Sequence, residues 1–148
     1  MKKIRVDHVK LIPGIYKSSV SGLSTIWDVR VKSPNKGDYM TPAVMHTIEH
    51  TMSQYLEGRL GSFRVVGVFS MADQTGFYVI TRFVGRALIH EAIVDYIMYI
   101  QCTSRIPGVN IHRCGHCELQ DLEGARKVML DYYTLALKYS TSALNYIK

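Results

Sequence analysis

Two histidines and a glutamate near the middle of the chain have the spacing of a metal site. His46 and His50 are four residues apart, and Glu49 lies between them. On a helix, residues four apart share one face, so both imidazoles can bind a single cation. Glu49 would lie beside them and could accept a proton next to the metal. Taken alone, the pair also fits two exposed or hydrogen-bonded histidines on an amphipathic helix.

A second cluster of ligand residue types lies far downstream in the sequence. It contains His112, Cys114, His116 and Cys117. A thiolate is a strong ligand for zinc or ferrous iron, and three protein ligands would leave one coordination position for a substrate. The Cys114-x-x-Cys117 spacing also fits a redox motif or half of a zinc knuckle. The three cysteines of the chain favour thiols or metal ligands over a disulfide framework.

The elements that must position these residues follow from the apolar pattern. Thr41 as N-cap and Pro42 at the first helical position predict a helix that continues without a breaker until Gly58. We expect two further helices, over about 86–102 and 121–138, with Cys102 in the core. The predicted strands cover 4–12, 23–32, 63–69 and 76–84. Since strands and helices do not alternate regularly, we expect one α+β domain over 1–148, with an antiparallel sheet packed against about three helices.

Composition restricts the class of protein. The chain has 148 residues, of which 47% are apolar and 20% charged, as expected for one folded domain. It has no apolar run near the ~20 residues that span a bilayer, and its N-terminus lacks the apolar core of a signal peptide. We therefore expect a soluble, cytoplasmic protein without membrane association. The net charge of +6 is scattered and no nucleic-acid motif accompanies it, so we expect no nucleic-acid partner.

Six short motifs, in consistent order, resemble the S-ribosylhomocysteine lyase (LuxS) family. They are Asp7-His8, Asp28-Val29-Arg30, Pro34-Asn35, His46–His50, Thr75–Tyr78 and Ile106–Gly115. The resemblance implies a small α+β homodimer, related in fold to metallopeptidases, with two active sites at the subunit interface. It implies one divalent metal per chain, ferrous iron with zinc or cobalt as substitutes. The implied reaction cleaves S-ribosylhomocysteine to homocysteine and 4,5-dihydroxy-2,3-pentanedione, the precursor of the autoinducer-2 signal.

The resemblance also assigns roles to individual residues. His46, His50 and Cys114 match the metal ligands of the family, and Glu49 matches a catalytic acid/base. His8 and Arg30 match residues that line the substrate pocket.

The chain departs from the family pattern around the substrate. Before Thr-Gly-Phe-Tyr the family reads Asp-x-Ser-Pro-Met-Gly-Cys-Arg, whereas residues 67–74 here read Gly-Val-Phe-Ser-Met-Ala-Asp-Gln. Asp73 therefore stands at the position of the second acid/base, a cysteine, and Gly67 at that of a pocket aspartate. Lys3 replaces a pocket serine. His116 and Gln120 replace an asparagine and a histidine.

Three interpretations follow from this combination of a kept metal site and an altered pocket. In the first, the chain is a lyase in which Asp73 faces the metal pocket and does the work of the cysteine. In the second, it is a paralogue that acts on another sugar thioether or binds metal and ligand without turnover. The third is an inverted zinc peptidase, because His46-x-x-Glu49-His50 also fits that pattern. Because free aspartate has a pKa near 3.9 and a free thiol one near 8.5, we expect slow or no lyase turnover.

Overall fold

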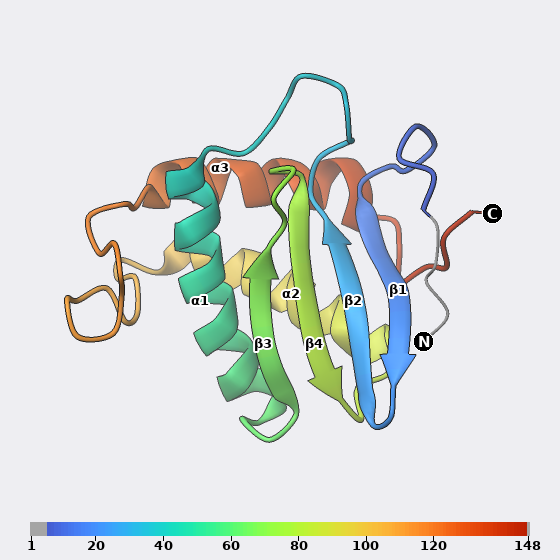
Figure 1. Ribbon diagram of the computed structural model, residues 1–148, viewed down its shortest axis with the longest axis horizontal. Helices are drawn as coiled ribbons and strands as arrows, with labels where there is room; N and C mark the ends of the chain where they lie inside the picture. The colour runs from blue at the N-terminus through green and yellow to red at the C-terminus, as the bar shows by residue number, and fades with distance from the viewer. Residues whose placement is uncertain (1–5, 148) are drawn as a thin grey trace.

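The protein is built from a four-stranded antiparallel sheet with its helices against one face (Figure 1). The computed structural model describes residues 6–147. In chain order the elements are β1 (Gly14–Ser21), β2 (Ser24–Arg30), α1 (Pro42–Leu60), β3 (Val65–Ser70), β4 (Gly76–Arg82), α2 (Arg86–Cys102), α3 (Leu122–Tyr132) and a π-helix, η1 (Tyr133–Leu137). The strand order is β1-β2-β4-β3, and every neighbouring pair is antiparallel. The predicted α+β class, with an antiparallel sheet and three α-helices, is confirmed.

Alternation along the strands separates the two faces of the sheet. The side chains that face the helices are buried and join one core: Trp27, Val29, Val65, Val68, Phe77 and Val79. The indole of Trp27 donates to the hydroxyl of Thr81 on the neighbouring strand, at 2.8 Å. This bond gives the indole nitrogen a partner inside the core, as a buried polar group requires.

Helix α1 begins where the sequence predicted and carries the two histidines. The Thr41 hydroxyl accepts from the backbone amide of Val44, and Pro42 opens the first turn. Gly58 does not stop the helix, which continues until Gly61 adopts a φ of 97°. The buried stripe that fixes the helix against the sheet consists of Met45, Ile48, Met52 and Leu56.

Two further local expectations are wrong. The strand predicted over 4–12 is not formed in its described part, because the Asp7 side chain accepts from the amide of Val9 and its carbonyl from that of Lys10, which makes a turn. The first strand starts later, at Gly14. Cys102 is exposed at the end of α2 rather than buried in the core.

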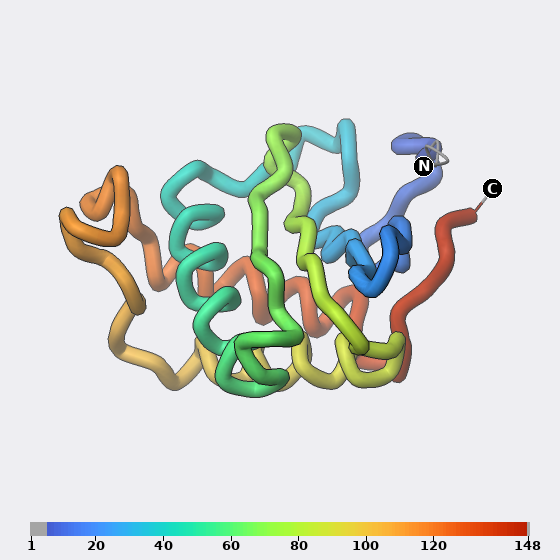
Figure 2. Tube along the Cα trace, turned by 60° about the horizontal axis from the view of Figure 1, so that its bottom comes forward, coloured from blue at the N-terminus to red at the C-terminus, as the bar shows by residue number. Residues whose placement is uncertain are grey.

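The long loop between α2 and α3 lies next to α1 at one end of the molecule (Figure 1 and Figure 2). Hydrogen bonds join it to α1, so residues far downstream reach His46 and His50. At the other end of the sheet, the segment after η1 runs beside β1, where Leu144 pairs with Tyr16. Among residues 6–147, the longest apolar helical stretches still fall short of what would cross a membrane.

Candidate metal centre

Three predicted ligands meet at the surface of α1. The Nε2 atoms of His46 and His50 are 3.0 Å apart, and the Cys114 sulfur is 3.4 Å from the His46 Nε2. The ligand atoms of all three residues lie within 4.8 Å of one another. Within residues 6–147, this is the one such group of three or more histidine, cysteine or acidic side chains.

Backbone carbonyls orient both imidazoles toward the common point. The His46 Nδ1 lies 2.7 Å from the carbonyl of Leu119, and the His50 Nδ1 lies 3.0 Å from that of Pro107. A carbonyl oxygen can only accept, so these contacts suit the tautomer in which Nδ1 donates and Nε2 is left to bind a cation. In that tautomer the two Nε2 lone pairs, 3.0 Å apart, repel unless a cation lies between them.

Two of the spacings among the three atoms fit a tetrahedral cation. With bonds of ~2.0 Å to nitrogen and ~2.3 Å to sulfur, two nitrogens lie about 3.3 Å apart and a nitrogen and sulfur about 3.5 Å apart. The observed distances of 3.0 and 3.4 Å are close to these values. Two imidazoles and a thiolate therefore fit zinc, ferrous iron or cobalt, with a fourth position left open.

The loop that carries Cys114 is shaped by Asn110 and Gly108. The Asn110 side chain accepts from the amides of His112 and Arg113, and its carbonyl accepts from the amide of Cys114 at 2.9 Å. Gly108 has a φ of 69°, and a Cβ there would lie 3.4 Å from the His50 Nδ1. The Ile-Pro-Gly-x-Asn motif thus forms the turn that brings the Cys114 thiol to the histidines.

Glu49 lies beside the triad and is held by a residue that the sequence did not identify. Its Oε2 accepts a hydrogen bond from the hydroxyl of Ser70, the last residue of β3. A cavity of about 470 Å³ is lined by Glu49, Ser70, His46 and His116, among others. A proton acceptor and one candidate metal ligand, His46, therefore line the same cavity. Neither His116, His112 nor Cys117 joins the triad in the part of the chain that the structure describes.

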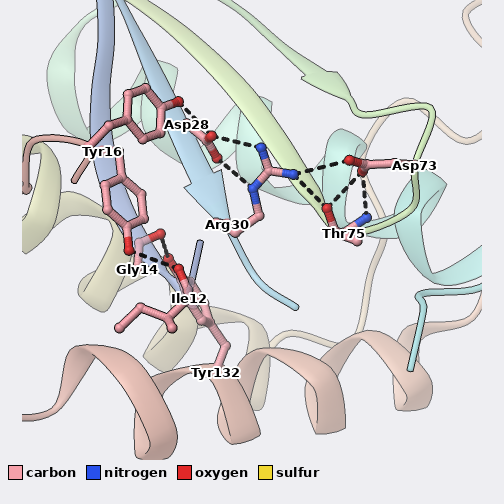
Figure 3. A network of polar contacts seen from close by, with 9 residues as sticks. Ile12, Gly14, Tyr16, Asp28, Arg30, Asp73, Thr75 and Tyr132 are labelled. Carbon is pink, nitrogen blue, oxygen red and sulfur yellow. Dashed lines mark hydrogen bonds and ion pairs between the residues drawn. The ribbon is translucent and has the colours of Figure 1, made fainter. Parts of the chain in front are cut away.

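Arg30 and Asp73 form a separate polar network on β2 and the turn before β4 (Figure 3). The buried Arg30 guanidinium pairs with Asp28 at 2.7 and 3.1 Å, and with Asp73 at 3.2 Å. Thr75 donates its amide and its hydroxyl to the other Asp73 oxygen. Partial burial acts to raise the pKa of Asp73, but the Thr75 hydrogen bonds and Arg30 together lower it below its ordinary value. The carboxylate is therefore held in its ionised form.

The structure divides the predicted site residues into two groups within one chain. Asp73 and His8 line a cavity of about 440 Å³, whereas Glu49 and His46 line the cavity at the metal centre. The turn residues Ala72 and Gln74 line both cavities. His8 and Asp73 thus share one cavity, with the buried Arg30 bonded to Asp73, whereas Glu49 and His46 share the other.

Two of the departures from the family pattern are explained by their neighbours. A Cβ on Gly67 would lie 2.7 Å from the ring of Phe69, so the phenyl ring occupies the space of the expected aspartate. Gln120 accepts from the Thr47 hydroxyl at 2.8 Å, and its amide nitrogen lies 3.1 Å from the His46 Nδ1. Lys3 lies outside the described residues.

We expect Asp28→Ala to destabilise the protein by about 3–5 kcal/mol, because it removes the buried carboxylate of the Arg30 charge and leaves it only the half-exposed Asp73 carboxylate and the Thr75 hydroxyl. The side chains of Asp28 and Arg30 are 1% and 2% exposed. Urea denaturation gives the free energy of unfolding. A matched control is Lys32→Ala, which breaks an exposed pair with Asp38 and should cost less than about 1 kcal/mol. Equal costs for the two variants would contradict this account of the network.

The set of candidate ligands and a comparison with known families both favour the same family over the zinc peptidases. Inverted zinc peptidases take a glutamate as third ligand, whereas here Cys114 completes the triad. The model of a family described as S-Ribosylhomocysteinase (LuxS) matches residues 1–142 of the chain.

Proposed function

Because the chain belongs to the S-ribosylhomocysteinase (LuxS) family, we propose that it is a metal-dependent lyase acting on S-ribosylhomocysteine. The proposed products are homocysteine and 4,5-dihydroxy-2,3-pentanedione. Family membership supports a carbon–sulfur lyase on a small-molecule substrate in general terms. The observation that carries the finer proposal is the cluster of His46, His50 and Cys114, whose His46 shares a cavity with Glu49. We propose that the whole chain acts as one metal-binding domain.

We propose ferrous iron as the bound metal, with zinc or cobalt as substitutes. A divalent cation supplies Lewis-acid stabilisation of negative charge on a substrate oxygen. The reaction must move the sugar carbonyl along the chain before the thiolate leaves, and every move takes a proton from one carbon and returns it to another atom. Glu49, in the same cavity as His46, is the group we propose for these transfers at the metal side.

Asp73 is the group we propose at the opposite side of the substrate. Its carboxylate lines the second cavity with His8 and accepts a hydrogen bond from the buried Arg30 at 3.2 Å. His8 and Arg30 would position the sugar. Because Asp73 is held ionised by Arg30 and Thr75, it accepts a proton only at a cost in free energy. We therefore propose a lyase whose turnover is slow compared with members that carry a cysteine at this position.

A homodimer would bring the two groups of site residues together. The sheet face that lies away from the helices exposes Val66, Phe69 and Tyr78, with exposed fractions of 44%, 49% and 39%. These side chains lie on the adjacent strands β3 and β4, where Phe69 pairs with Tyr78. A second copy packed on this face would cover an apolar surface that a lone chain leaves in water. We propose that the His8–Asp73 cavity of one subunit completes the metal cavity of the other.

We expect sedimentation equilibrium to give about twice the chain mass of 16.8 kDa at micromolar concentration. Phe69→Glu places a charge in the proposed interface and should weaken dimerisation by at least about 100-fold. Phe63→Glu is the matched control, since Phe63 is an exposed aromatic residue outside the strands and should leave the dimer intact. A monomeric parent protein, or equal behaviour of the two variants, would refute this interface.

A second candidate function is binding, or turnover of another sugar thioether, without lyase activity. The observation that favours it is the Asp73–Arg30 ion pair, which occupies a pocket arginine with an internal carboxylate. A ligand anion would then have to compete with Asp73 for that guanidinium.

Exchange of the sugar's carbon-bound hydrogen with solvent deuterium distinguishes a lyase from a binding protein. The iron- or cobalt-loaded protein is incubated with S-ribosylhomocysteine in D₂O, and deuterium at the sugar carbons is followed by NMR. A lyase with slow elimination should still exchange carbon-bound hydrogen, and Glu49→Gln should abolish the exchange. Absence of exchange with full metal occupancy would contradict the lyase and favour the binding role.

A further inference from the structure

The Ser70–Glu49 hydrogen bond joins β3 to α1 at the edge of the metal centre. Ser70 is the last residue of β3 and pairs with Phe77, which faces the core. Its side chain therefore points toward α1, on the side opposite to the exposed Phe69. There its hydroxyl donates to the Oε2 of Glu49.

Glu49 lies so close in sequence to the candidate ligands that the direction of its carboxylate decides whether it can reach the metal. It precedes His50 on α1 and follows His46 by three residues, so it shares the helix face of two candidate ligands. It lines the metal cavity on one side and, with His50, a groove of about 310 Å³ on the other. Carboxylate oxygens are good ligands for divalent cations. A free Glu49 side chain could therefore bind the metal as a further ligand beside the water and block the approach of a substrate.

We propose that Ser70 is a positioning residue that holds the Glu49 carboxylate against the end of β3 and away from the metal. This inference rests on the proposed function only for the presence of the metal. The hydroxyl engages one oxygen of the carboxylate, which leaves the other oxygen free to face the cavity. Glu49 can then act on a substrate while the fourth metal position stays open.

The sequence around Ser70 indicates that the Ser70–Glu49 hydrogen bond is particular to this chain. In the family motif quoted for this segment, the residue at the position of Ser70 is a proline, which has no hydroxyl to donate. The neighbouring positions differ as well, with Gly67 and the Phe69 ring on the other face of the strand. The hydrogen bond from β3 to Glu49 thus occurs in the same segment as the substitutions that alter the pocket.

Cobalt spectroscopy tests the inference without relying on activity. The full-length protein is loaded with Co(II), and the visible d–d absorption reports whether the ion has four or five ligands. The parent and Ser70→Thr, which keeps the hydroxyl, should both give the intense four-coordinate spectrum. Ser70→Ala should reduce the d–d absorption about twofold as Glu49 becomes a fifth ligand next to water. The double variant Ser70→Ala with Glu49→Gln should regain the parent spectrum.

Each other result overturns the inference in a recognisable way. If the parent binds no cobalt, the proposed metal site fails and the role of Ser70 fails with it. If the parent binds cobalt and Ser70→Ala has the same spectrum, the metal site stands and the positioning role is wrong. If Ser70→Ala loses cobalt altogether while its far-ultraviolet circular dichroism is unchanged, Ser70 supports the ligands rather than Glu49, which also contradicts the inference.

Discussion

In a Cys114→Ala variant, we expect the metal content after dialysis to fall from one ion per chain to nearly none. The variant keeps His46 and His50 but loses the thiolate, whose sulfur lies 3.4 Å from the His46 Nε2. Even changes to groups that only orient a ligand cost about 10–100-fold in metal affinity, so loss of a ligand should cost at least about 100-fold. Metal analysis by plasma mass spectrometry measures the content directly.

A second cysteine on the same loop provides the matched control. Cys117 lies three residues after Cys114 and outside the triad, so Cys117→Ala should retain the metal. Undiminished metal in Cys114→Ala would contradict the ligand assignment. Equal loss in both variants would show that the loop, rather than one sulfur, is needed.

The second large effect concerns Asp73, and we expect Asp73→Cys to raise lyase turnover by about 10–100-fold. A thiol with a pKa near 8.5 stores and returns a proton near neutral pH far more readily than a carboxylate with a pKa below 3.9. Hydrogen bonds from Thr75 and the charge of Arg30 hold the pKa of Asp73 below its ordinary value. Each pKa unit of mismatch corresponds to about 1.4 kcal/mol, which permits a tenfold change in the rate of a proton transfer.

Asp73→Ala is the control that separates the effect of the new thiol from the effect of losing the Arg30–Asp73 ion pair. Both variants break the ion pair between Arg30 and Asp73, but only the cysteine adds a group that can carry a proton. Turnover measured as free thiol released should rise in the cysteine variant and not in the alanine variant. Equal rates in the parent and Asp73→Cys would place Asp73 away from the reaction centre.

The helical elements were predictable because their signals are local. Thr41 and Pro42 mark the start of α1, and the stripe of Met45, Ile48 and Met52 fixes which face is buried. The first strand was not predictable from its apolar content, because Asp7 makes a turn with its own neighbours. Strand β1 instead depends on pairing with β2, a contact between segments that local patterns do not report.

The candidate ligands His46 and His50 could be chosen from residue type and spacing, and Cys114 from the family resemblance, but their surroundings could not be predicted. The carbonyls of Leu119 and Pro107 orient the histidines, yet any residue supplies a carbonyl. Ser70 reaches Glu49 only because β3 packs beside α1. The separation of Asp73 from the triad depends on which side of the 72–74 turn each side chain takes.

The most direct test of the central proposal is the release of free thiol from S-ribosylhomocysteine. The iron- or cobalt-loaded protein is used at high concentration under anaerobic conditions, and released homocysteine is titrated over hours. We predict slow, metal-dependent release that exceeds one thiol per chain and is absent from the metal-free protein and from Glu49→Gln. No release above background from protein with full metal occupancy would contradict the assignment of this chain as a lyase.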